Sequence, residues 1–249
     1  MTKLILALQA DNIHQAKKIY RRTQSFVDVY KIGIDLYTKT GPSIIKYLVK
    51  AQEEVFLDLK FCDIPSVVCK ALLSSLQLGV SMITIHTTGG IEMMKMAADT
   101  LREFSEKYRL EKRPIILGVT ILTSISPKAL AILWGKKSMR NLTAEVCRLA
   151  YLAKKAGLDG VVASAHEIKA IKKKCGGDFI VVVPGIRLVP QETKTAEGAK
   201  KLATDDQVRF ETPRYAAQNG ADYIVVGRPI IQALDPVAVI KRIREELKI

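Results

Sequence analysis

The sequence predicts an α/β protein, a (β/α)8 barrel of the TIM-barrel class that forms a single domain over residues 1–249. Short apolar runs of the kind that form buried parallel strands recur eight times along the chain. Segments with helical periodicity lie between most of these runs. The composition shows no linker-like shift, and about 250 residues is the usual length of such a barrel. A doubly wound open sheet, which shares this alternation, is the main alternative.

The expected elements follow one another in a regular order. The strands are predicted at residues 4–8, 27–32, 55–59, 82–85, 115–119, 160–163, 179–183 and 223–226. The helices are predicted at residues 43–51, 67–78, 91–107, 143–156, 166–173, 212–219 and 236–247. Gly41-Pro42-Ser43 opens one helix, and Gly79, Gly157 and Gly220 each follow the last turn of another. These glycines are interpreted as parts of the scaffold.

Composition and charge narrow the classes of function. The formal net charge is +14, but the basic residues are scattered and most fall on polar faces or in late turns of expected helices. This distribution favours solvated helix faces and attraction of an anionic small molecule, and no nucleic-acid partner is expected. No apolar run reaches the roughly 20 residues of a membrane span, and the beginning of the chain is interpreted as a first strand. We therefore expect a cytoplasmic protein with no membrane contact.

The four cysteines predict neither disulfides nor a metal centre. Cys62, Cys69, Cys147 and Cys175 include no Cys-x-x-Cys pair and have no histidine at ligand spacing. We expect no bound metal and no organic cofactor.

A run of charged residues follows the third expected strand. Asp58, Lys60 and Asp63 lie within the stretch Asp-Leu-Lys-Phe-Cys-Asp-Ile-Pro that begins at Asp58. Because a strand alternates its faces with period two, Asp58 and Lys60 are expected to point the same way, whereas Asp63 falls in the turn beyond. By itself, an Asp-x-Lys pair is also compatible with a surface ion pair.

Other candidate residues also follow the ends of strands, where barrel enzymes carry their chemistry. They are Gln9, Lys31, His86, Thr123, Pro184, Arg187, Gly227 and Arg228. Three of them also have a simpler interpretation: Thr123 suits a turn or a helix cap, Arg228 suits the surface, and His86 is interpreted as structural. The concentration of these residues at strand ends carries more weight than any single one.

The segments Lys31-Ile32-Gly33 and Asp58-x-Lys60-x-x-Asp63-Ile64-Pro65 resemble the active-site signature of the orotidine 5'-monophosphate decarboxylase family. The resemblance implies that Lys31, Asp58, Lys60 and Asp63 form an alternating charge network. It also implies a homodimer with shared active sites, because in the family the last aspartate comes from the neighbouring subunit. In this network Lys60 would donate a proton to carbon 6 of the pyrimidine.

The same resemblance assigns substrate contacts. Pro184-Gly185-Ile186-Arg187, Asp206-Gln207-Val208-Arg209 and Gly227-Arg228 are similar to the family's phosphate-binding segments, with Arg187, Gln207 and Arg228 as contacts. Thr123 would meet the pyrimidine edge, and Ile64 and Pro184 are further expected contacts. Gln9 stands where the family usually has a ribose-binding aspartate, and Val67 stands where it has a threonine.

The activity implied by this resemblance is decarboxylation of orotidine 5'-monophosphate to uridine 5'-monophosphate in de novo pyrimidine biosynthesis, without a cofactor. Two alternatives stay open at this point. One is another phosphate-binding barrel of the same superfamily, such as a sugar-phosphate decarboxylase or epimerase. The other is a catalytically impaired protein that binds pyrimidine nucleotides, which the departures at Gln9 and Val67 favour.

Overall fold

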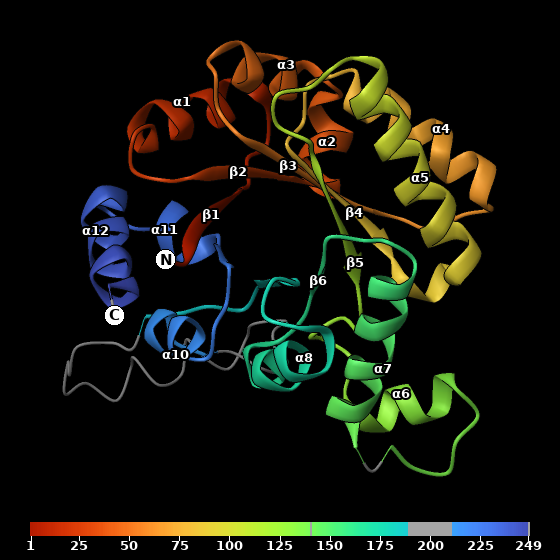
Figure 1. Cartoon of the computed structure of the whole chain (residues 1–249). Helices are drawn as coiled ribbons and strands as arrows, with labels where there is room; N and C mark the ends of the chain where they lie inside the picture. The colour runs from red at the N-terminus through yellow and green to blue at the C-terminus, as the bar shows by residue number, and fades with distance from the viewer. Residues whose placement is uncertain (140, 189–210, 249) are drawn as a thin grey trace, which may run out of the picture.

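The structure is a computed structural model that describes residues 1–139, 141–188 and 211–248, and its eight parallel strands close into a barrel (Figure 1). The strands are β1 (Lys3–Leu8), β2 (Val29–Gly33), β3 (Val55–Phe61), β4 (Met82–His86), β5 (Ile115–Val119), β6 (Gly160–Val162), β7 (Ile180–Val183) and β8 (Tyr223–Val226). β1 pairs with β8 through the register of Lys3 with Tyr223, so the sheet has no free edge. The predicted barrel is confirmed, and the open-sheet alternative is excluded.

Helices surround the barrel. They are α1 (Ile13–Thr23), α2 (Ile34–Thr40), α3 (Ser43–Lys50), α4 (Pro65–Leu76), α5 (Ile91–Lys107), α6 (Pro127–Leu133), α7 (Leu142–Lys155), α8 (Ile168–Cys175), α10 (Pro213–Gln218), α11 (Arg228–Ile231) and α12 (Pro236–Leu247), with short 3-10 turns at Thr87–Gly89 and Ala165–Glu167. No helix of the described residues is both long and apolar enough to cross a membrane.

Four of these helices, α1, α2, α6 and α11, are additional to the segments expected from the sequence. α1 is strongly polar overall, with Lys17, Lys18, Arg21 and Arg22 among its eleven residues, so it lacks the apolar content of the expected helices although it buries one face. The expected helix at 67–78 begins earlier, at Pro65, because proline suits the first turn of a helix, where its missing N–H is not needed.

Alternation along the strands separates two layers of core. Leu4, Leu6 and Leu8 belong to the large cluster that packs the sheet against the helices. Ile5 and Ala7 belong to a second cluster, whose other buried members are Val29, Phe56, Met82, Leu117, Val182, Tyr223 and Val225. This second set fills the barrel interior. On β1 to β4, the next position on the same face toward the carboxyl end lies two residues further along. These positions are Gln9, Lys31, Asp58 and Thr84, so polar side chains replace apolar ones there.

Three aspartates stabilise the opposite, amino-terminal end of the barrel. Each precedes an even-numbered strand, and its carboxylate accepts a backbone N–H from the strand before. These bonds run from Leu4 to Asp28 at 2.7 Å, from Ile116 to Asp159 at 2.8 Å and from Val181 to Asp222 at 2.7 Å. The paired cations are Arg244, Arg113 and Lys172, respectively. Ser81 takes the equivalent place before β4, where its hydroxyl accepts the N–H of Val55 at 3.4 Å.

Candidate active site

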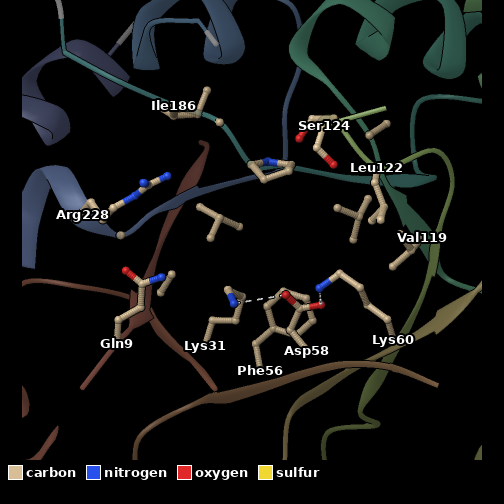
Figure 2. A pocket seen from close by; sticks show the side chains of 18 of the residues that line it. Gln9, Lys31, Phe56, Asp58, Lys60, Val119, Leu122, Ser124, Ile186 and Arg228 are labelled. Atoms are coloured by element: carbon tan, nitrogen blue, oxygen red, sulfur yellow. Dashed lines mark hydrogen bonds and ion pairs between the residues drawn. The ribbon is translucent and has the colours of Figure 1, made fainter. Parts of the chain in front are cut away.

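A cavity of about 380 Å³ opens at the carboxyl ends of the strands. Nine of the site residues predicted from the sequence line it: Gln9, Lys31, Asp58, Lys60, Thr123, Pro184, Arg187, Gly227 and Arg228. They come from β1, β2, β3, β5, β7 and β8 or the turns after these strands, so the closed barrel brings together residues that are far apart in the sequence. Figure 2 shows Arg228 and Gln9 at one side of the cavity and Lys60, Leu122 and Ser124 at the other.

Asp58 is the centre of the charged group. Its Oδ2 lies 3.1 Å from Lys31 Nζ, and its Oδ1 lies 2.8 Å from Lys60 Nζ (Figure 2). Burial raises the pKa of the Asp58 carboxyl, but the charges and hydrogen bonds of Lys31 and Lys60 oppose this effect and leave the pKa below its ordinary value. Asp58 is therefore an anion at neutral pH, and each of its carboxylate oxygens forms an ion pair with a lysine ammonium group.

The backbone of β3 is irregular where it carries this group. Leu57 pairs with Ile83 and Phe61 pairs with Ile85, so the three residues 58–60 stand opposite the single residue Thr84. Lys60 has φ = 54°, a left-handed conformation that is unusual outside glycine. Asp58 and Lys60 both face the cavity, as the expectation that they point the same way requires, but the regular alternation behind that expectation is interrupted by a bulge.

Lys31 reaches Asp58 across the gap between β2 and β3. Gly33 is the register partner of Asp58, and a Cβ atom at Gly33 would lie 3.1 Å from Lys31 Nζ. The missing side chain therefore leaves room for the ammonium group beside the carboxylate. Phe56, one step earlier on β3, lies beneath the pair and gives the cavity an apolar floor (Figure 2).

Two arginines, Arg187 and Arg228, and two glycines, Gly185 and Gly227, also line the cavity. Gly185 has φ = 77°, and the Ile186–Glu211 bridge beside it fixes the backbone of Arg187, whose N–H donates to Glu211 O at 2.9 Å. At Gly227 a Cβ atom would lie 3.3 Å from Ala7 Cβ, so glycine keeps the end of β8 close to β1. Backbone that can approach a ligand closely, together with guanidinium groups, suits an oxyanion such as phosphate.

Two predicted residues of the described part of the chain, Asp63 and Ile64, are not among those that line the cavity. β3 ends at Phe61, and the turn beyond carries Asp63 and Ile64 outward; Ile64 is 63% exposed. Asp63 Oδ1 accepts the N–H of Ile64 at 2.6 Å. Gln207 lies outside the described residues. The expected substrate contact of Ile64 and the expected cross-subunit role of Asp63 stay predictions.

Sequence reasoning missed one residue in contact with the charged group. Thr84 is fully buried on β4, and its hydroxyl lies 3.0 Å from Asp58 Oδ1. A usable signal was present, because Thr84 is the one polar residue between Met82 and His86 in an otherwise apolar run. A hydroxyl in a buried strand needs a hydrogen-bond partner, and the neighbouring strand β3 carries the charged residues Asp58 and Lys60.

His86 ends the same strand. Burial and the nearby charge of Lys60 both lower the pKa of its imidazole, and its Nδ1 lies 2.7 Å from the hydroxyl of Thr88. The neutral ring in a local turn suits the structural role that was expected. Among the described residues, no three His, Cys, Asp or Glu side chains lie close enough together to hold a metal ion.

Fold and site together define the class: a (β/α)8 barrel with a Lys–Asp–Lys centre in a cavity that arginines and glycines also line, at the carboxyl ends of its strands. Residues 2–243 match the Orotidine 5'-phosphate decarboxylase / HUMPS family, and the chain belongs to this family. It is 42% identical to an orotidine 5'-phosphate decarboxylase of Legionella pneumophila (strain Lens), with 98% of this chain and 99% of the relative covered.

Two further similarities extend over nearly the whole chain. An orotidine 5'-phosphate decarboxylase of Trichlorobacter lovleyi is 41% identical, with 98% of this chain and 95% of the relative covered. The crystal structure of the orotidine 5'-phosphate decarboxylase from Lactobacillus acidophilus superposes with a TM-score of 0.82 at 33% identity, and each chain is covered completely. The resemblance inferred from the β3 motif is thereby confirmed at the level of the family.

Proposed function

We propose that this protein decarboxylates orotidine 5'-monophosphate to uridine 5'-monophosphate and carbon dioxide, a step of de novo pyrimidine biosynthesis. The family name also includes a second group, so membership alone does not choose the reaction. Full-length relatives named orotidine 5'-phosphate decarboxylase support the choice. The main supporting observation is the pair of ion pairs that Asp58 forms with Lys31 and Lys60, in a cavity that Arg228 also lines.

The order of side chains in the cavity suggests how the substrate lies. The phosphate would bind at Arg187 and Arg228, and the ribose would follow beside Gln9 and Lys31. The pyrimidine would then extend past Asp58 and Lys60 toward Ser124 (Figure 2). Thr123, which precedes Ser124 and also lines the cavity, would meet its far edge. This pose places the substrate carboxylate on carbon 6 beside the Asp58 carboxylate.

The charges then act at two moments of the reaction. Asp58, which is ionised at neutral pH, repels the substrate carboxylate, and this repulsion is relieved as carbon dioxide leaves. The bond between carbon 6 and the carboxylate breaks, and its electron pair stays on carbon 6. The Lys60 ammonium group stabilises this carbanion and donates a proton to it, and water later restores the proton on Lys60. Lys31 holds the second oxygen of Asp58 and keeps the carboxylate in place.

The proposal includes a homodimer in the cytoplasm. Asp63 lies at the surface, outside its own cavity, which suits a residue that completes the site of a neighbouring subunit. The exposed side chains of Ile64 and Val67 on the same turn and helix would be covered by such a contact. All four cysteines are free thiols, which fits a reducing compartment.

The direct test of the activity follows the ultraviolet absorbance of orotidine 5'-monophosphate in the presence of a chelator. We expect the absorbance of the substrate to fall with wild-type protein and to stay constant with Lys60→Ala. A wild-type protein that binds uridine 5'-monophosphate but leaves the substrate intact would show an impaired nucleotide-binding homologue. If turnover requires an added metal ion, the proposal of a cofactor-independent reaction is wrong.

Subunit mixing tests the shared site separately. Lys60→Ala and Asp63→Ala are each expected to be inactive. In a hybrid dimer one site receives both changes and the other receives neither, so random exchange restores up to about a quarter of the sites. Recovered activity supports cross-subunit sharing. An inactive mixture, with subunit exchange demonstrated by mass spectrometry of tagged chains, would place Asp63 in the site of its own subunit.

A further inference from the structure

Thr84 joins two parts of the charged group that lie on another strand. Its side chain is fully buried on β4, and its Oγ1 accepts the backbone N–H of Lys60 at 2.9 Å. The same hydroxyl lies 3.0 Å from Oδ1 of Asp58, the oxygen that also binds Lys60 Nζ. One hydroxyl therefore contacts the main chain of one charged residue and the side chain of the other.

The direction of both hydrogen bonds is fixed by chemistry. A backbone N–H can only donate, so the Thr84 oxygen must accept from Lys60. The ionised Asp58 can only accept, so the single hydroxyl proton of Thr84 points to its carboxylate. A donor to the charged form of Asp58 also favours ionisation, in the same direction as the two lysines.

The bulge in β3 explains why a side chain is needed at this place. Residues 58–60 stand opposite Thr84 alone, and the regular pairing of β3 with β4 is displaced between Leu57 and Phe61. Lys60 adopts φ = 54° there, and its N–H bonds to the Thr84 side chain. An N–H group that is removed from water and finds no acceptor in the protein would destabilise this conformation, because its hydrogen bond to water is not replaced.

We propose that Thr84 is a positioning residue that sets the geometry of Asp58 and Lys60 for catalysis. By holding the Lys60 backbone in its left-handed conformation and one Asp58 oxygen in a fixed orientation, it determines where the Lys60 ammonium group points. This inference rests on the proposed decarboxylase function, in which Lys60 must deliver a proton to one carbon atom.

The test compares two substitutions of similar size. Thr84→Val keeps the shape of the side chain and removes both hydrogen bonds, whereas Thr84→Ser keeps the hydroxyl. Since small displacements of a reacting group are costly, we expect Thr84→Val to lower kcat about 10- to 100-fold. Binding of uridine 5'-monophosphate should change by less than about threefold, because the phosphate contacts are untouched, and kcat of Thr84→Ser should stay within about threefold of wild type.

Thr23→Val is the matched control. The Thr23 hydroxyl is also fully buried, donates to Ile19 O at 3.0 Å and lies 3.0 Å from the Tyr30 hydroxyl, away from the cavity. We expect this variant to lower the melting temperature and leave kcat unchanged. If Thr84→Val likewise changes only the melting temperature, the proposal is wrong. A Thr84→Ser variant that folds but loses kcat as strongly as Thr84→Val would also overturn it.

A second measurement separates this inference from the proposed function. Hydrogen exchange of the Lys60 amide, followed by NMR, needs no substrate. We expect fast exchange in Thr84→Val and protection in wild type and Thr84→Ser. An inactive wild-type protein would contradict the proposed function, whereas an equally protected Lys60 amide in Thr84→Val would contradict the positioning role. The exchange data also decide the case if Thr84→Val is too unstable for kinetics.

Discussion

The two ends of the barrel use buried carboxylates in different ways. The Asp58 side chain is 12% exposed and that of Asp159 is 14% exposed, and both pair with cations. Asp159, at the amino-terminal end, also accepts the backbone N–H of Ile116 and so joins β6 to β5. The partners found for Asp58 among the described residues are the side chains of Lys31, Lys60 and Thr84, and it faces a cavity.

This difference separates scaffold from site. A carboxylate that accepts a main-chain N–H replaces a missing ladder partner and stabilises the fold. A carboxylate whose partners are all side chains does not hold the backbone of a neighbouring strand. The two cations at its oxygens keep it ionised although burial favours the neutral form. Changes at Asp58 should therefore affect the reaction first, and changes at Asp159 should affect stability first.

The largest effect is expected at the carboxyl end of the barrel. Lys60→Ala removes the proposed proton donor and should reduce turnover below detection, while binding of uridine 5'-monophosphate stays within about tenfold because the phosphate contacts remain. Single-turnover assays and nucleotide titration measure the two quantities. Near-normal turnover in this variant would show that the proton comes from another group.

The second-largest effect is expected at Arg228, where the phosphate is proposed to bind. Arg228→Ala is expected to lower kcat/KM by about 2 to 4 kcal/mol in free energy of activation, since binding energy at the phosphate contributes to the transition state. Arg228→Lys, which keeps the charge without the planar fork, should recover part of this loss. Steady-state kinetics of both variants provide the measurement. If the kinetics of Arg228→Ala match wild type, the phosphate binds elsewhere.

At the opposite end, Asp159→Ala should destabilise the protein without changing the chemistry. It leaves the N–H of Ile116 without its acceptor and removes the partner of Arg113. The expected loss is about 1 to 3 kcal/mol in the free energy of unfolding, measured by urea denaturation. Kinetic constants of the folded variant should equal those of wild type. A fall in kcat with unchanged stability would contradict the division between the two ends.

The pH dependence of stability should reveal the ionised state of Asp58. Its pKa in the folded protein lies below the ordinary value of 3.8, so its ionisation stabilises the fold above that pH and loses this contribution as the pH falls through the folded-state value. Over this acid range, the free energy of unfolding should fall more steeply in wild type than in Asp58→Asn. Urea titrations at several pH values measure the two slopes. Parallel slopes would show that the lysines do not outweigh the effect of burial.

The sequence predicted the barrel and most of the cavity because both depend on local patterns. The apolar runs placed β1 to β8 within two residues of their observed bounds, and residues after strand ends meet wherever a barrel closes. The bulge at Lys60 depends on pairing between β3 and β4, which no local pattern contains. The local sequence marks Thr84 as a polar residue in an apolar run, but its contacts with Asp58 and Lys60 depend on this pairing. Asp28, Asp159 and Asp222 were missed because their acceptor role appears only once neighbouring strands are in register.

Gln9 offers the smallest and most specific test, because it lines the cavity and is expected to contact the ribose with a neutral amide rather than a carboxylate. Gln9→Asp should add a charge-assisted hydrogen bond to a ribose hydroxyl and tighten binding of uridine 5'-monophosphate by about 1 kcal/mol, or roughly fivefold. Lys31 lies between Gln9 and Asp58, so its ammonium group offsets repulsion between the two carboxylates (Figure 2). Gln9→Glu is the control, because it adds the same charge on a longer side chain and should gain less. Calorimetric titration of the three proteins measures the difference. Weaker binding by Gln9→Asp than by wild type would show that this side of the cavity is built around a neutral amide, and that Lys31 does not offset a second carboxylate beside Asp58.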